Sequence, residues 1–144
     1  MLYVEYQIIR DRYMDALRSY NDLIGEKEEM FQMTQPGAVR YDKEKVSGNT
    51  GRDAFEEYVI LKDRTRIDER INEQKSIMEE WKRLKGIKEG DLRCSKDLHD
   101  RIYTYFYLDR LSLTQIERRI PYSRVQIWRI LKIIKKNCDS APWS

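Results

Sequence analysis

The amino-acid sequence predicts an all-α protein with two parts, a long N-terminal antiparallel helical hairpin and a C-terminal trihelical helix-turn-helix domain. Three observations lead to this prediction. The 144 residues include only three prolines and six glycines, so the composition permits long helices. Apolar residues recur at helical spacing over residues 2–32 and 53–85. Two Ser-x-x-Gln sequences follow near the C-terminus, and each is typical of the first turn of a helix.

Residues 2–32 are predicted to form one amphipathic helix. Three rows of apolar residues recur at intervals of seven: Tyr6, Tyr13 and Tyr20; Ile9, Ala16, Leu23 and Met30; Leu17, Ile24 and Phe31. A heptad recurrence sustained over about four heptads indicates a coiled-coil-like seam. Two interpretations stay open. The stripe packs against the rest of the same chain, or it joins copies of the chain into a homo-oligomer, expected to be a dimer.

Residues 33–51 are predicted to form a loop, because they contain two segments rich in Gly, Pro, Ser and Asn. The glycines do not follow the Gly-x-x-x-x-Gly-Lys pattern, so no nucleotide-phosphate site is expected. The basic residues of this loop are interpreted as solvated side chains rather than DNA contacts: Arg40, Lys43 and Lys45.

A second long helix is predicted over residues 53–85, from a capping Asp53 to a stop at Gly86. Its apolar side consists of Tyr58, Ile60, Ile67, Ile71, Ile77, Met78, Trp81 and Leu84. Two helices of similar length joined by one loop predict an antiparallel hairpin over residues 1–86. Residues 86–95 are predicted to be a hinge-like linker, because they contain Gly86 and Gly90.

The helix-turn-helix domain is predicted over residues 96–137, with residues 138–144 as a tail that includes Trp143. A support helix over 96–109 comes first. The predicted core of the domain consists of apolar residues at helical spacing: Leu98, Ile102, Phe106, Leu111, Leu113, Ile116, Ile120, Ile127, Leu131 and Ile134.

The two helices of the motif are predicted to begin at Ser112 and Ser123. Pro121 lies between them, has no N–H group and disfavours helical backbone at Ile120, so the first helix is expected to stop at Ile120.

Charge and side-chain chemistry favour DNA as the partner and argue against an enzyme. Residues 96–144 carry ten basic and five acidic residues, whereas residues 1–95 carry 18 basic and 20 acidic ones. Positive charge therefore accumulates where a phosphate backbone would bind. His99 is the sole histidine and has no nucleophile spaced to use it, so we expect no catalytic residues. No ligand spacing for a metal is found, and no cofactor is expected.

The cysteine usage and the hydropathy predict a soluble, cytoplasmic protein. Cys94 and Cys138 are far apart, which argues against a zinc site or disulfide framework and fits a reducing compartment. No run approaches the roughly 20 apolar residues of a membrane span, and charged residues interrupt the N-terminus too early for a signal peptide. We therefore expect no membrane partner.

The run from Leu111 to Ile116, followed by Tyr122-Ser123 and Ile127, resembles region 4 of bacterial sigma-70 factors. In plan the chain is similar to the RinA and ArpU families of phage late-gene regulators and to a group of streptococcal phage proteins. The motif covers about residues 96–136. The resemblance implies a phage or prophage transcriptional regulator that binds double-stranded DNA in the bacterial host cytoplasm, acting as a dimer or with RNA polymerase.

Two residues depart from the sigma-like pattern. Position 117 is usually small, because the two helices cross closely there, but here it is Glu117. The turn usually contains a residue with positive φ, which Pro121 cannot adopt. Either the helices cross more widely, or Glu117 turns outward and pairs with Arg124 or Arg129.

The resemblance also implies roles for residues of the second helix, over 124–136. Base edges in the major groove are assigned to Arg124, Val125 and Arg129. Phosphate contacts are assigned to Thr114, Gln115, Arg118, Arg119, Lys132, Lys135 and Lys136. For Lys135 and Lys136 a solvated helix end is an equal alternative. Trp128 is interpreted as a core or interface residue rather than a base-stacking platform.

Two other functions remain as alternatives. A phage small terminase subunit also joins a helix-turn-helix to helical oligomerisation segments, but it forms rings and packages DNA. A protein-binding module would use the basic face or the hairpin to bind RNA polymerase or a host defence complex.

Overall fold

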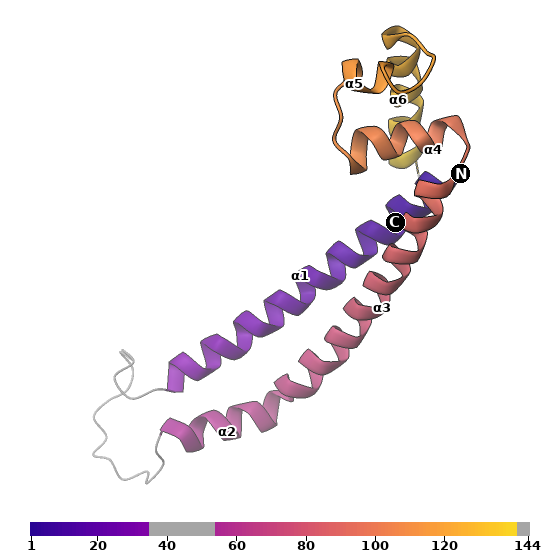
Figure 1. Ribbon diagram of the computed structural model, residues 1–144. Coiled ribbons are helices and arrows are strands. Elements are labelled where there is room, and N and C mark those ends of the chain that lie inside the picture. Colours follow the sequence, from indigo (N-terminus) through magenta and orange to yellow (C-terminus); the bar gives the residue numbers. More distant parts are fainter. Residues whose placement is uncertain (35–53, 141–144) are drawn as a thin grey trace. The chain divides into compact units, whose positions relative to one another are not determined.

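The computed structural model describes residues 1–34 and 54–140, which form helices and connecting segments without a strand. The helices are α1 (Leu2–Thr34), α2 (Ala54–Thr65), α3 (Ile67–Cys94), α4 (Leu98–Tyr103), the π-helix η1 (Thr104–Leu108), α5 (Leu113–Glu117) and α6 (Arg124–Asp139) (Figure 1). The all-α prediction is confirmed. None of the helices in this part of the chain is long and apolar enough to cross a membrane.

The predicted bounds of the loop and of the tail are placed too early in the sequence. Met33 and Thr34 still belong to α1, and α6 continues through Cys138 to Asp139. The remainder of the loop, with its three basic residues, lies outside the described residues, as does Trp143.

The chain divides into two compact units, and each contains part of α1 and part of α3. Unit 1 consists of residues 1–14 and 79–144, and unit 2 consists of residues 15–78.

Unit 2 has a small core of Met30, Ile67 and Ile71, with Tyr20, Leu23 and Tyr58 packed around it. The prediction of one continuous helix over 53–85 is wrong, because the helix breaks at Arg66. Arg66 adopts the left-handed conformation, with φ 52°, which ends an α-helix. An arginine carries no sequence signal for this conformation, which is usually left to Gly or Asn.

The linker predicted over 86–95 is absent, because α3 continues through Gly86 and Gly90 to Cys94. A glycine within a helix costs only about 1 kcal/mol relative to alanine. Packing of the last turns of α3 within unit 1 offsets this free-energy penalty. There Leu92 is 1% exposed and belongs to the core.

The three apolar rows of α1 differ in burial. Tyr6, Ala16 and Met30, from the first two rows, are buried within their respective units. Ile24 and Phe31, from the third row, remain 39% and 43% exposed. The other members of the first two rows, Ile9, Tyr13, Tyr20 and Leu23, are half-buried. The chain therefore covers the first two rows more fully than the third, part of which is open to solvent.

The core of unit 1 contains most of the predicted apolar residues and several unpredicted ones. Six predicted residues are buried: Ile102, Ile116, Ile120, Ile127, Leu131 and Ile134. The other four, Leu98, Phe106, Leu111 and Leu113, are partly buried against this cluster. Tyr3, Tyr6, Leu92 and Tyr103 complete it. The first turns of α1 thus belong to the same core as α4, α5 and α6.

Polar contacts fix the start of α1 in unit 1. The buried Asp100 carboxylate accepts hydrogen bonds from the Tyr3 backbone N–H at 3.1 Å and from the Ser95 hydroxyl at 2.8 Å. The Asn137 amide donates to the Tyr3 hydroxyl at 2.7 Å. Asp100 thereby satisfies one of the free N–H groups at the N-terminus of α1.

Candidate nucleic-acid interface

Both helices of the predicted motif begin with a capping box. The Ser112 hydroxyl accepts from the Gln115 backbone N–H at 3.3 Å, and the Gln115 side chain accepts from the Ser112 N–H at 2.9 Å. Ser123 and Gln126 repeat this arrangement at the same two distances. The predicted starts of α5 and α6 are confirmed. These bonds are local, so they follow directly from the Ser-x-x-Gln sequence.

The turn between α5 and α6 is closed by backbone hydrogen bonds. The helix α5 ends at Glu117, so the prediction that it extends to Ile120 is wrong. The N–H groups of Arg119 and Ile120 both bond to the Ile116 carbonyl, at 2.9 and 3.2 Å. The Ile120 side chain is 4% exposed and packs into the core. Burial of Ile120 therefore fixes the turn, with Pro121 following at the surface.

The turn contains no residue with positive φ. Among the described non-glycine residues, this conformation is found only at Arg66 and Arg110. Glu117 turns outward, and its carboxylate lies 3.8 Å from Nε of Arg124. Of the two alternatives drawn from the sequence, the outward glutamate paired with Arg124 is the one observed.

Arg124 joins the two helices of the motif. In addition to Glu117, its guanidinium Nη2 donates to the Thr114 hydroxyl at 2.8 Å. Its side chain is still 57% exposed. The structure thus brings together Arg124, predicted to read a base, and Thr114, predicted to contact a phosphate.

The remaining predicted contacts are exposed on α5, the turn and α6. The exposed set comprises Gln115, Arg118, Arg119, Val125, Arg129, Lys132, Lys135 and Lys136. Ile127, Leu131 and Ile134 form the buried side of α6. Val125, Arg129, Lys132 and Lys136 follow the i, i+4, i+7, i+11 spacing of one helix face and lie opposite that buried side. We call these four residues the outer stripe of α6.

Aromatic residues accompany the cations. Trp128 is 48% exposed rather than part of the core, and the Lys132 ammonium lies 3.9 Å from the centre of its ring. The Arg119 guanidinium lies 5.8 Å from the centre of the Tyr105 ring. These cation–π contacts hold long side chains in place on the surface.

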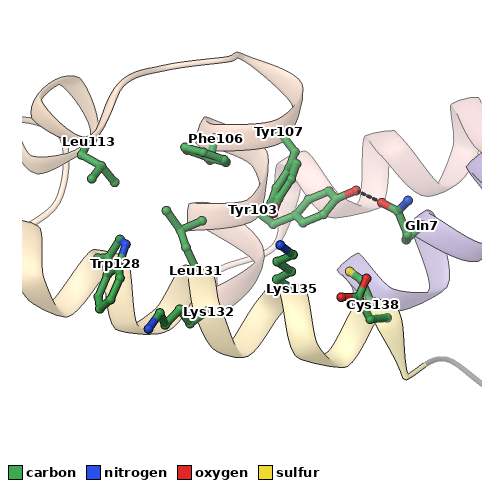
Figure 2. Close-up of a pocket in the computed structure, with 11 residues that line it drawn as sticks. Gln7, Tyr103, Phe106, Tyr107, Leu113, Trp128, Leu131, Lys132, Lys135 and Cys138 are labelled. Carbon is green, nitrogen blue, oxygen red and sulfur yellow. Dashed lines mark hydrogen bonds between the residues drawn. The ribbon is translucent and has the colours of Figure 1, made fainter.

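Sequence reasoning missed a cavity of about 650 Å³ beside α6. It lies between α6 and the segment of α4 and η1 that carries Tyr103, Phe106 and Tyr107 (Figure 2). The Tyr103 hydroxyl at this cavity donates to Gln7 at 2.7 Å. Gln7 and Tyr103 are 96 positions apart, so no local sequence pattern could have placed them together.

The described residues contain no cluster of three or more His, Cys, Asp or Glu side chains that could hold a metal ion. Cys94 and Cys138 are both free thiols. Cys138 lines the cavity, and burial raises the pKa of its thiol.

No family model, no curated protein and no solved structure matches the chain.

Proposed function

We propose that this chain is a sequence-specific DNA-binding transcriptional regulator of phage or prophage type. In this proposal α4, α5 and α6 act as a sigma-70 region 4-like helix-turn-helix, and α1 to α3 act as a helical hairpin. The protein works in the cytoplasm of a bacterial host, as a dimer or together with RNA polymerase.

The observation that carries the proposal is the outer stripe of α6. It combines three cations with one exposed valine, Val125, on a helix that begins with a capping box. A cationic helix face open to solvent suits the major groove of DNA, which admits one α-helix. The excess of basic residues over residues 96–144 adds attraction to phosphates that does not depend on sequence.

Within this proposal some residues recognise bases and others bind phosphates. Arg129 is suited to the O6 and N7 atoms of guanine, and Val125 to a thymine methyl group. The cations of the turn and of the C-terminal half of α6 bind phosphates and fix the register of the helix without reading bases.

Arg124 has to exchange partners when it binds DNA. In the free chain its guanidinium is engaged by Glu117 and Thr114. The acidic partner competes with the base or phosphate that Arg124 would contact. We expect Glu117→Gln to raise DNA affinity by a factor of about 1.4 to 5, because exposed ion pairs are worth about 0.2–1 kcal/mol. Titrations at constant salt concentration would measure this change.

The experiment that tests the proposal begins with selection of DNA fragments from the neighbouring genome, followed by binding measurements on the fragment selected. Arg129→Ala should weaken binding by about 1–3 kcal/mol and relax selectivity at one base pair. Lys136→Ala should weaken binding to all sequences and reduce the slope of the salt dependence by about 1.

Arg18→Ala is a matched control, because Arg18 is an exposed arginine of unit 2 whose side chain is 72% exposed. It should bind like the parent protein. If Arg129→Ala binds with the parent's affinity and selectivity, the assignment of α6 to the groove fails.

The oligomeric state separates this proposal from a role in DNA packaging. Exposed apolar side chains of unit 2, Ile24, Phe31, Met33 and Phe55, favour association of copies. Light scattering should give the mass of a dimer. A ring of about eight or more subunits would instead favour a small terminase subunit.

A protein-binding module is the second candidate, and the exposed apolar residues of α6 favour it. Val125, Trp128 and Ile133 are 56%, 48% and 47% exposed, which suits a protein partner such as RNA polymerase or a host defence complex. If DNA binding lacks any dependence on salt while the chain binds polymerase, this candidate replaces the first.

A further inference from the structure

We propose that the cavity between α6 and η1 binds a small amphipathic organic anion, with a flat apolar body and one carboxylate or sulfonate group. The cavity measures about 650 Å³, within the range of roughly 300–1,000 Å³ usual for small-molecule sites. All of its lining residues belong to unit 1.

The walls of the cavity are flat and apolar. Tyr103 and Tyr107 stack with ring centres 4.8 Å apart, and Phe106 meets Tyr107 edge-on at 5.0 Å. Trp128 and Leu131 lie across from them on α6 (Figure 2). Aromatic side chains in the lining favour a planar apolar guest, because aromatic rings prefer offset stacked or edge-on contacts.

The charges at the cavity favour an anion. Lys132 and Lys135 line it from α6, and Asp139 is the single carboxylate among its lining residues. Lys132 is already held over the Trp128 ring at 3.9 Å, so its ammonium is fixed near the apolar wall. A guest with an apolar body and an anionic end satisfies both kinds of group.

The backbone of η1 is a second observation that points to this cavity. The Asp109 N–H donates to the Thr104 carbonyl at 2.9 Å, which is the i→i+5 bond of a π-helix. π-helical segments are rare in proteins overall, but those that occur are often found at functional sites. Here the π-helical segment supplies Phe106 and Tyr107 to the cavity wall.

Binding of the anion has a consequence that rests on the proposed function. Lys132 and Lys135 are also proposed to contact phosphates, so the anion and DNA would compete for the same two ammonium groups. Binding of the anion is itself measured without DNA, so its failure is distinct from a failure of the proposed function.

The test uses two fluorescent probes with similar rings and different charge, 1-anilinonaphthalene-8-sulfonate and the neutral N-phenyl-1-naphthylamine. Both are titrated into the full chain and into the double variant Lys132→Gln/Lys135→Gln. We expect affinity for the sulfonate to fall about tenfold, equivalent to about 1.4 kcal/mol, while affinity for the neutral probe stays within twofold.

A matched control removes two cations from the outer stripe, as Arg129→Gln/Lys136→Gln. It has the same net charge as the first variant, and neither residue lines the cavity. It should bind both probes like the parent chain. An equal loss of sulfonate binding in both variants would overturn the proposal, since general charge attraction would then explain the binding.

Cys138 reports where the probe binds. In the Cys94→Ser background, the sulfonate should slow alkylation of Cys138 by iodoacetamide at least threefold, measured by mass spectrometry. Unchanged alkylation at saturating probe would place the probe elsewhere on the chain and overturn the site.

Discussion

Units 1 and 2 are both helical, and both include part of α1 and part of α3, yet they are stabilised differently. Among the residues that the structure describes, unit 1 buries ten apolar residues in one cluster, whereas the cluster of unit 2 contains three. Both units also have exposed ion pairs. Examples are Arg93 with Asp109 at 3.1 Å in unit 1, and Asp68 with Lys27 at 2.7 Å and with Lys62 at 3.2 Å in unit 2. Burial of apolar groups contributes about 1.5–3 kcal/mol per large side chain, and an exposed ion pair about 0–1 kcal/mol. The unit that holds α6 therefore gains more stabilisation from buried apolar side chains than the described part of unit 2 does.

The largest expected effect is loss of a core isoleucine from unit 1. Ile127→Ala should reduce the free energy of unfolding by about 2–5 kcal/mol, because Ile127 is 0% exposed and its removal leaves a cavity. Ile71→Ala in unit 2 should cost about 2 kcal/mol, the lower end of that range, since the small core around Ile71 can collapse.

Urea unfolding would measure both variants with two signals. The sequence has no tryptophan over residues 15–78, so tryptophan fluorescence reports on unit 1, whereas far-UV circular dichroism reports on both units. An equal cost for the two substitutions would contradict the difference between the units.

The next effect concerns the polar contacts at the start of α1. Asp100→Ala should reduce the free energy of unfolding by about 1–3 kcal/mol, because it leaves the Tyr3 N–H and the Ser95 hydroxyl without their acceptor. Asp91→Ala is a suitable control, since Asp91 is exposed on α3 of the same unit and should change stability by less than about 0.5 kcal/mol. Thermal unfolding of both variants would test this, and equal midpoints would show that Asp100 does not hold α1.

The contacts of Asp100 also show what sequence reasoning can and cannot predict. The starts of α5 and α6 were predictable, because the serine and glutamine of each capping box are three residues apart and their hydrogen bonds are local. The buried stripe of α6 was predictable from its helical period. Tyr3 and Asp100 are 97 positions apart, and no local pattern pairs them.

The two wrong helix boundaries over residues 53–95 have a related cause. Gly86 suggested a helix end, but the helical penalty of glycine is small compared with the packing gained by Leu92 farther along α3. Arg66 ends α2 through a left-handed backbone conformation, which its side chain does not signal. Neither outcome follows from the local preference of the residue concerned.

Alkaline pH should weaken unit 1. Burial raises the pKa values of Tyr3, Tyr6 and Tyr103 above the ordinary value near 10. Because the folded chain keeps these protons longer than the unfolded chain, their stabilising effect is complete below pH 10. It is lost as the pH rises from 10 toward the folded-state pKa values.

For Tyr103 alone the loss should be up to about 1.4 kcal/mol over the first pH unit above 10. Urea midpoints followed by tryptophan fluorescence at pH 8 and pH 11 would measure it. Tyr103→Phe should have a shallower dependence on pH. If this variant loses as much stability as the parent chain between the two pH values, the buried phenol of Tyr103 is not the cause.

Acid pH should weaken unit 2, and this is the smallest effect. Hydrogen bonds from Lys27 and Lys62 hold the pKa of Asp68 below its usual value. A lowered pKa stabilises the fold above the unfolded-state value, near 3.9, and this contribution disappears as the pH falls through the folded-state pKa. Since Asp68 is 44% exposed, the contribution should stay below about 1 kcal/mol.

Asp68→Asn tests this acid dependence. Followed by circular dichroism, the variant should be less stable than the parent at pH 6, and the difference should shrink as the pH is lowered to 2. Asp63→Asn, at an exposed position of α2, should match the parent at both pH values. A difference between Asp68→Asn and the parent that is as large at pH 2 as at pH 6 would mean that packing, rather than charge, links α2 and α3 to α1 at this position. Unit 2 would then resemble unit 1 in the source of its stability.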